Sequence, residues 1–188
     1  MDTIPAMPDT YLSLTTDDIE IRFAEADRPS ALLAGEALGE RVPELLKVFE
    51  IDSGFPPIQV VLVPDRDEFD RLVRDLLKVE IEVPSHPARI AQPQRTDMVV
   101  LSPTAYAEHS TFEYVPEDFR RLLVHEVVHM IEEHLSPDIE ASLRWWGEGL
   151  AVFFSGQSEH EEGFRRPALN GVVAGAIPTI EELSLIHI

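Results

Sequence analysis

The sequence RRLLVHEVVHMIEEHL, residues 120–135, contains three histidines and three glutamates among leucines and valines. His125 and His129 are four positions apart, so on an α-helix they lie about 40° apart around the axis and one turn along it. Both imidazole rings can therefore reach the same ion. With Glu126 next to the first histidine, the residues form the pattern H-E-x-x-H, in which two histidines bind zinc and the glutamate acts as a general base.

The residues around this motif predict two helices. Pro116 stands where a first helical residue is favoured, and the acidic residues at 117 and 118 complement the helix dipole. We therefore expect the helix of the motif to run from 116 to about 134. A second helix is predicted over 142–154, SLRWWGEGLAVFF, although glycine is a poor helix former.

The third histidine does not fit the same metal site. His134 lies nine positions after His125, which is about 180° around an α-helix, so its ring points away from the other two. We predict that it is a surface histidine near the helix C-terminus, where a positive charge is favoured. Glu132 and Glu133 are predicted to face solvent. A third ligand therefore has to come from another segment.

A glutamate in the second predicted helix has the spacing of a third ligand. Eighteen residues separate His129 from Glu148, which stands in the sequence WWGEGLAVF, residues 145–153. Here the chain resembles the gluzincin clan of zinc metallopeptidases. In its aminopeptidase N-like and peptidase MA-like members, H-E-x-x-H is followed after eighteen residues by a ligand Glu in the context W-x-x-E-G-x-A. The chain matches that context at Trp145, Glu148, Gly149 and Ala151.

The resemblance implies a fold, a cofactor and a reaction. The fold would be a single α+β, zincin-like domain with a small mixed β-sheet, the H-E-x-x-H helix and a second, ligand-bearing helix. One Zn²⁺ per chain would be bound by His125, His129 and Glu148, leaving a fourth position for water. Glu126 would act as the general base for that metal-activated water in the hydrolysis of a peptide bond. Small residues at 147, 149 and 151 would let the second helix approach closely.

An alternative interpretation is a catalytically degenerate zinc-binding domain that serves as a peptide- or protein-binding module. Glu126 argues against it, because a purely structural zinc site does not need a base beside the metal. Tyr106 and Tyr114 are interpreted as packing residues, with the alternative that one of them donates a hydrogen bond to the oxyanion of the reaction.

Candidate substrate-binding residues come from one short segment. The sequence ARIA, residues 88–91, is interpreted as an edge strand. In the gluzincin clan such a strand pairs with an extended peptide substrate. Arg89, Ile90 and Ala91 are therefore candidates for binding a peptide or protein substrate, and an ordinary edge strand is the alternative.

The remaining patterns predict further strands and helices around the two motifs. Alternating or continuous apolar residues indicate strands, and leucines and valines at helical spacing indicate helices, the first of them with a break or restart at Pro43. The predicted strands are 19–24, 56–64 and 97–103, and the predicted helices are 29–49 and 65–78, the latter capped by Asp65.

The two ends of the chain are interpreted separately from the domain. Residues 1–18 lack periodicity and are predicted to be a lead-in, so that the metallopeptidase domain spans 19–182. The last six residues, LSLIHI (183–188), resemble the translation of a transposon end sequence used in preparing sequencing libraries. We interpret them as a non-native tail and expect the domain to be truncated at its C-terminus.

Composition narrows the possible partners. The chain of 188 residues carries a formal charge of −20, which repels phosphate backbones and argues against nucleic acid as a partner. It contains no cysteine, so thiolate nucleophiles and zinc sites with cysteine ligands are excluded. The sequence has neither a signal peptide pattern nor an apolar run of about 20 residues, so we expect a cytoplasmic protein without a membrane segment.

Overall fold

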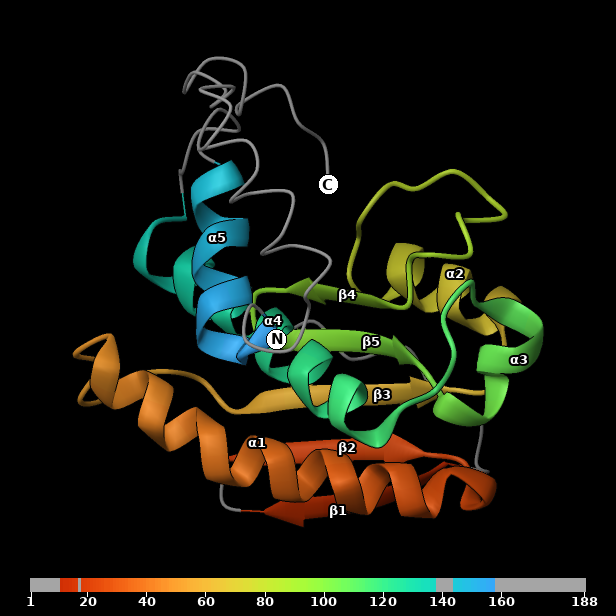
Figure 1. Cartoon of the computed structure of the whole chain (residues 1–188), viewed down its shortest axis with the longest axis horizontal. Helices are drawn as coiled ribbons and strands as arrows, with labels where there is room; N and C mark the ends of the chain where they lie inside the picture. Colours follow the sequence, from red (N-terminus) through yellow and green to blue (C-terminus); the bar gives the residue numbers. More distant parts are fainter. Residues whose placement is uncertain (1–10, 17, 138–143, 158–188) are drawn as a thin grey trace, which may run out of the picture.

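The computed structural model describes residues 11–16, 18–137 and 144–157. Within these ranges the chain forms one five-stranded mixed β-sheet and five α-helices, which confirms the predicted α+β class. The strand order across the sheet is β1-β2-β3-β5-β4, which can be followed from bottom to top in Figure 1.

Parallel strands form the centre of the sheet and antiparallel strands form its edges. The three parallel strands are β2 (Ile19–Phe23), β3 (Ile58–Val63) and β5 (Asp97–Leu101), and the two antiparallel edge strands are β1 (Leu12–Thr16) and β4 (Ala91–Gln94). The central strand β3 is buried along most of its length, as expected for a β-branched strand that is covered on both faces. Pro93 in β4 is tolerated because an edge strand leaves N–H positions unpaired.

The helices cover the sheet and carry the two sequence motifs. They are α1 (Arg28–Val48), α2 (Arg66–Asp75), α3 (Tyr106–His109), α4 (Pro116–Leu135) and α5 (Arg144–Ser155), with short 3-10 turns at Glu25–Asp27 and Pro103–Ala105. Helix α1 packs against β1 and β2, and α4 packs against α1, β4 and α5. Figure 1 shows α5 beside α4 at the end of the sheet from which β3 and β5 start. The two motifs therefore lie on neighbouring helices.

The predicted lead-in over residues 1–18 is wrong for residues 12–16, which form strand β1. This strand pairs with β2 along its whole length, from Leu12 opposite Phe23 to Thr16 opposite Ile19. Most of its side chains are exposed, and apolar residues alternate with polar ones only over Leu12, Ser13 and Leu14, which is too short a pattern to indicate a half-buried strand. The strand forms because β2 offers it a row of backbone hydrogen-bond partners.

The predicted break at Pro43 is also wrong, because α1 continues through this residue. Pro43 lies on the exposed side of the helix, and so does Gly39, whose carbonyl would accept from the missing N–H of the proline. Water can hydrate that carbonyl. On the opposite side Leu38, Val42 and Leu45 are buried in the core and hold both halves of the helix in place.

The predicted edge strand at residues 88–91 is displaced toward the C-terminus, since β4 spans Ala91–Gln94. The guanidinium of Arg66 binds the carbonyl of Arg89, which fixes the preceding segment in a conformation that is not a strand. Ladder pairing begins with the carbonyl of Ile90, which accepts a hydrogen bond 2.8 Å long from β5. Tertiary contacts of a loop therefore decide where this strand starts.

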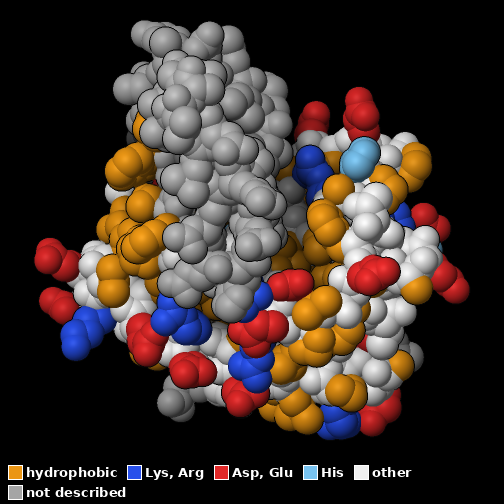
Figure 2. Space-filling view, viewed as in Figure 1, with side chains coloured by type: hydrophobic (Ala, Val, Ile, Leu, Met, Phe, Trp, Pro, Cys, Tyr) orange, Lys and Arg blue, Asp and Glu red, His pale blue; other side chains and the backbone are white. Residues whose placement is uncertain are grey.

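Charged and apolar side chains both reach the surface. Figure 2 shows Asp and Glu on several parts of this face, with Lys and Arg between them, so that the negative charge is distributed. Hydrophobic side chains gather beside α5, where Trp146 and Phe153 are exposed. Among the described residues, the helices are too short or too polar to cross a membrane.

Candidate metal centre

Helix α4 holds the rings of His125 and His129 next to each other. The ring centroids are 4.8 Å apart, and the two Nε2 atoms lie 3.1 Å from each other. Both side chains are largely buried, while Leu123, Val127 and Ile131 of the same helix are fully enclosed in the core. The apolar side of α4 thus fixes the helix, and the four-residue spacing brings the two rings to one place.

Helix α5 brings the carboxylate of Glu148 to the two rings. Its Oε2 atom lies 3.4 Å from Nε2 of His125, and its Oε1 atom lies 3.6 Å from Nε2 of His129. Helix α5 packs along α4, and its Ala151 is fully buried in the core. The three predicted ligands therefore lie together, with one ligand atom of each within 4.8 Å of the others.

The separations between the ligand atoms fit a bound zinc ion. Ligand atoms about 2.1 Å from a zinc ion at tetrahedral angles lie about 3.4 Å from one another. The two Nε2 atoms are 3.1 Å apart, and Glu148 approaches each of them with a different oxygen, Oε2 at 3.4 Å from His125 and Oε1 at 3.6 Å from His129. Each of these contacts is near the expected separation, although with one ligand atom per residue the spread reaches up to 4.8 Å. The donor set, two imidazole nitrogens and one carboxylate, is also one that zinc accepts. This group could hold a metal ion.

The side chain of Glu126 is buried beside this group. Only 9% of its surface is exposed. Burial raises the pKa of its carboxyl, the charges of His125 and His129 lower it, and the charge of Glu148 raises it. A carboxyl group with a raised pKa takes up a proton more readily than an ordinary glutamate, and proton uptake and release are what general acid–base catalysis requires.

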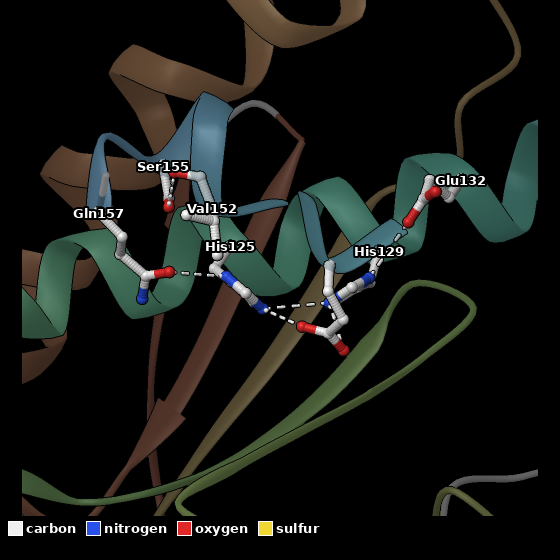
Figure 3. A network of polar contacts seen from close by, with 7 residues as sticks. His125, His129, Glu132, Val152, Ser155 and Gln157 are labelled. Atoms are coloured by element: carbon white, nitrogen blue, oxygen red, sulfur yellow. Dashed lines mark hydrogen bonds and ion pairs between the residues drawn. The ribbon is translucent and has the colours of Figure 1, made fainter. Parts of the chain in front are cut away.

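The outer nitrogen of each ring has a polar partner, shown by the dashed lines in Figure 3. Nδ1 of His125 lies 2.9 Å from Oε1 of Gln157, and Nδ1 of His129 lies 3.2 Å from Oε2 of Glu132. Each contact is made on the side of the ring away from the Nε2 atom. Both rings are therefore held so that Nε2 faces the other predicted ligands.

Sequence reasoning missed these two partners. The prediction that Glu132 and Glu133 face solvent is wrong, because both carboxylates are partly buried and bonded. Glu133 accepts from the side chain of Gln94 at 2.7 Å and from the backbone N–H of Arg95 at 2.6 Å, which ties α4 to the β4–β5 turn. The three-residue spacing from His129 to Glu132 was a usable signal, since such residues are neighbours on a helix. Gln157 offered no comparable signal.

The charges within the group are strongly coupled. Burial opposes a positive charge on His129, but hydrogen bonds to Glu132 and Glu148 and the charge of Glu126 outweigh it and raise the pKa of the ring to about 10. Hydrogen bonds from His125 and His129 lower the pKa of Glu148 to about 2, against the effect of burial. In the absence of a metal, a proton therefore stays on His129 opposite an ionised Glu148.

The small residues of α5 play different parts in bringing the helices together. A Cβ atom at Gly147 would lie 2.6 and 2.9 Å from the two carboxylate oxygens of Glu132, closer than atoms can approach. At Gly149 the same atom would meet nothing within 4 Å. The prediction that the residues at 147, 149 and 151 all permit close approach is therefore wrong for Gly149 and agrees with the contact at Gly147 and the burial of Ala151.

Other predicted residues lie outside the group formed by the three ligands. His134 is exposed at the end of α4, where its ring stacks edge-on with Phe55, as expected for a surface histidine. The hydroxyl of Tyr106 is buried, which prevents it from reaching a substrate, and Tyr114 packs edge-on against this ring. Residues 183–188, interpreted as a non-native tail, lie outside the described residues.

The three candidate substrate-binding residues lie at the start of the edge strand. Ala91 is the first residue of β4, Ile90 pairs with β5 through its carbonyl, and Arg89 is exposed and donates to the side chain of Gln92 at 2.8 Å. Strand β4 packs against α4, the helix that carries two of the predicted ligands. Their role in binding a substrate stays a prediction.

Comparisons of the chain with family models, with curated proteins and with solved structures find no match. The two sequence motifs and the geometry of the group formed by His125, His129, Glu148 and Glu126 are therefore the features that indicate a function.

Proposed function

We propose that the protein is a zinc metallopeptidase of the gluzincin type, with a zincin-like fold, that hydrolyses peptide bonds. One observation carries the proposal: the ligand atoms of His125, His129 and Glu148 converge within 4.8 Å of one another, and the two Nε2 atoms and the two carboxylate oxygens make contacts of 3.1 to 3.6 Å. A buried glutamate follows the first histidine directly in the chain. The pairing of H-E-x-x-H with W-x-x-E-G-x-A at a spacing of eighteen residues adds the resemblance to that clan.

The number and kind of ligands favour a catalytic site over a structural one. Structural zinc sites are closed by four protein ligands, whereas catalytic sites have three and leave one position for water or substrate. Within the described residues, His125, His129 and Glu148 form a group of three. Two neutral imidazoles and one carboxylate neutralise only half the charge of Zn²⁺, so the site retains the positive charge that polarises a substrate.

The residues around the site have separate roles in hydrolysis. Zinc bound here supplies a Lewis acid, which polarises a carbonyl and lowers the pKa of water. His125 and His129 bind the metal through Nε2, and Glu148 binds it through its carboxylate. Glu126 accepts a proton from the attacking water and passes it to the leaving amine, for which its raised pKa is suited.

The test combines metal content with the removal of the base. We expect the purified chain to contain about one zinc per molecule and to cleave members of a broad fluorogenic peptide library. Glu126→Gln should retain the zinc and lose activity by about a hundredfold or more, which is typical for the loss of a general base. Glu117→Gln, on the exposed first turn of the same helix, is the matched control and should behave like the wild type.

Three results would contradict the proposal in different ways. If the protein holds no zinc after exposure to the metal, the proposed zinc site itself is contradicted. A protein that binds zinc and peptides without cleaving them would instead establish the alternative, a zinc-binding domain that serves as a peptide- or protein-binding module. Equal activity of wild type and Glu126→Gln would remove Glu126 from the mechanism.

A further inference from the structure

A carboxylate outside the predicted ligand set is in direct contact with one of the ligands. Oε2 of Glu132 lies 3.2 Å from Nδ1 of His129, one turn further along α4. Only 14% of the Glu132 side chain is exposed, so the carboxylate is held between α4 and α5 and does not extend into solvent. Among the described residues, the ring of His129 is the hydrogen-bond partner of this partly buried carboxylate.

We propose that Glu132 is a positioning residue, which fixes the ring of His129 for metal binding, and that Gly147 leaves the space this carboxylate needs. The inference rests on the proposed zinc site and deepens it. It assigns the contact between α4 and α5 a task in metal retention that neither sequence motif contains.

The chemistry of a carboxylate explains how Glu132 acts on the ring. A neutral imidazole carries one hydrogen, on Nδ1 or on Nε2, and only the other nitrogen can bind a metal. An ionised carboxylate accepts hydrogen bonds and cannot donate one. Contact with Glu132 therefore keeps the hydrogen of His129 on Nδ1 and leaves the lone pair of Nε2 for the metal.

The partner of the other histidine lacks this property. The side-chain amide of Gln157 can accept through its oxygen or, after rotation, donate through its nitrogen. Its contact with Nδ1 of His125, at 2.9 Å, is thus compatible with a hydrogen on either ring nitrogen. Of the two outer contacts, only that of Glu132 selects the metal-binding form of its histidine.

The contact between Glu132 and His129 requires the absence of a side chain at Gly147. A Cβ atom at this position would lie 2.6 Å from Oε2 and 3.1 Å from Cδ of Glu132. The atoms in the way belong to the end of a flexible side chain, so the carboxylate, and not the backbone, would move. Gly147→Ala should therefore leave the fold intact and displace Glu132 from His129.

The experiment measures how fast the zinc-loaded protein releases its metal to an excess of a coloured chelator. The test variants are Glu132→Ala, Glu132→Gln and Gly147→Ala. The matched controls are Glu133→Ala, whose carboxylate binds the β4–β5 turn, and Gly149→Ala, where an added Cβ meets nothing within 4 Å. Because release is measured from the loaded protein, the charge of the metal-free rings does not affect it.

We expect Glu132→Ala to release zinc about ten to a hundred times faster than the wild type, the usual cost of removing such a partner. Glu132→Gln should lie between the two, since its amide oxygen still accepts from Nδ1 but without a charge. Gly147→Ala should approach Glu132→Ala, while both controls stay within about twofold of the wild type. Nitrogen NMR of zinc-loaded protein should show a slowly exchanging Nδ1 hydrogen on His129, which Glu132→Ala loses.

The outcomes separate this inference from the proposed function. A wild-type chain that does not take up zinc contradicts both. Zinc-loaded wild type together with Glu132 variants that release metal no faster than Glu133→Ala overturns the inference alone. If Glu132→Ala does not fold, Glu132→Gln and Gly147→Ala decide, and wild-type rates in both would also overturn it.

Discussion

Arg66 and the candidate metal centre are two clusters of largely buried charge, and they are held together in opposite ways. Arg66 is 7% exposed, and its guanidinium donates to three backbone carbonyls, those of Pro87, Arg89 and His109, and to the hydroxyl of Ser85. Every contact pairs a donor with an acceptor. The cluster is complete with the protein's own atoms.

The candidate metal centre instead brings potential acceptors to face one another. The Nε2 atoms of His125 and His129 and the carboxylate of Glu148 make contacts of 3.1 to 3.6 Å, with Glu126 buried beside them. Without a cation, only a proton can hold such a group together, which is why the pKa of His129 is raised to about 10. A cluster of this kind is suited to binding a cation, whereas the Arg66 cluster is suited to fixing a loop.

The largest expected effect is the loss of stability when the Arg66 cluster is disrupted. Arg66→Ala leaves partly buried carbonyls and the nearby buried carboxylate of Asp70 without their cation, and should lower the free energy of unfolding by about 2–4 kcal/mol. Denaturant titration measures it. Arg74→Ala, at an exposed position of the same helix, is the control and should cost less than about 1 kcal/mol.

Zinc release from folded Arg66→Ala that equals that of the wild type would sharpen the comparison between the two clusters. It would show that the Arg66 cluster affects stability and not metal binding. A loss of less than about 1 kcal/mol would contradict the assignment, since a loop whose carbonyls do not need the guanidinium is not fixed by Arg66.

The next largest effect is the pH dependence of metal binding. The raised pKa of His129, about 10, means that zinc has to displace a proton from this ring at neutral pH. The apparent zinc affinity should therefore rise about tenfold per pH unit between about pH 7 and pH 9, with about one proton released per zinc. Calorimetry in buffers of different ionisation enthalpy measures the proton count, and a flat affinity would contradict the prediction.

The same two pKa shifts set the pH dependence of the metal-free fold. The pKa of His129 is raised from 6.5 to about 10, so its contribution to stability is present below 6.5 and is lost as the pH rises to about 10. The pKa of Glu148 is lowered from 4.5 to about 2, so its contribution is present above 4.5 and is lost as the pH falls toward 2. The pair therefore stabilises the metal-free protein most between these two reference values.

Sequence reasoning succeeded where the signal is local. The helical spacing of His125 and His129, the apolar run of β3 and the cap of α2, where Asp65 accepts from the N–H of Glu68 at 2.8 Å, all follow from neighbouring residues. It also identified Glu148, through a spacing that carries a resemblance to a family. The resemblance itself stays a hypothesis.

The features that were missed depend on contacts between distant segments. Strand β1 exists because β2 pairs with it, and α1 continues through Pro43 because its opposite side is buried. Gln157 lies 32 positions from the ring of His125 that it contacts. No periodicity within a segment predicts such contacts, because their free energy comes from a partner that the local sequence does not contain.

The smallest expected effect separates the two glycines that flank Glu148, to which sequence reasoning assigned the same role. Gly149→Ala should stabilise the metal-free protein by about 0.5–1 kcal/mol, because alanine favours the helix and its Cβ meets nothing within 4 Å. Gly147→Ala should gain less, because the added atom displaces the carboxylate of Glu132 from His129. Denaturant titration of both variants measures the difference. Equal gains would mean that Glu132 gives way without cost, and its contact with His129 would then contribute nothing to holding α5 against α4.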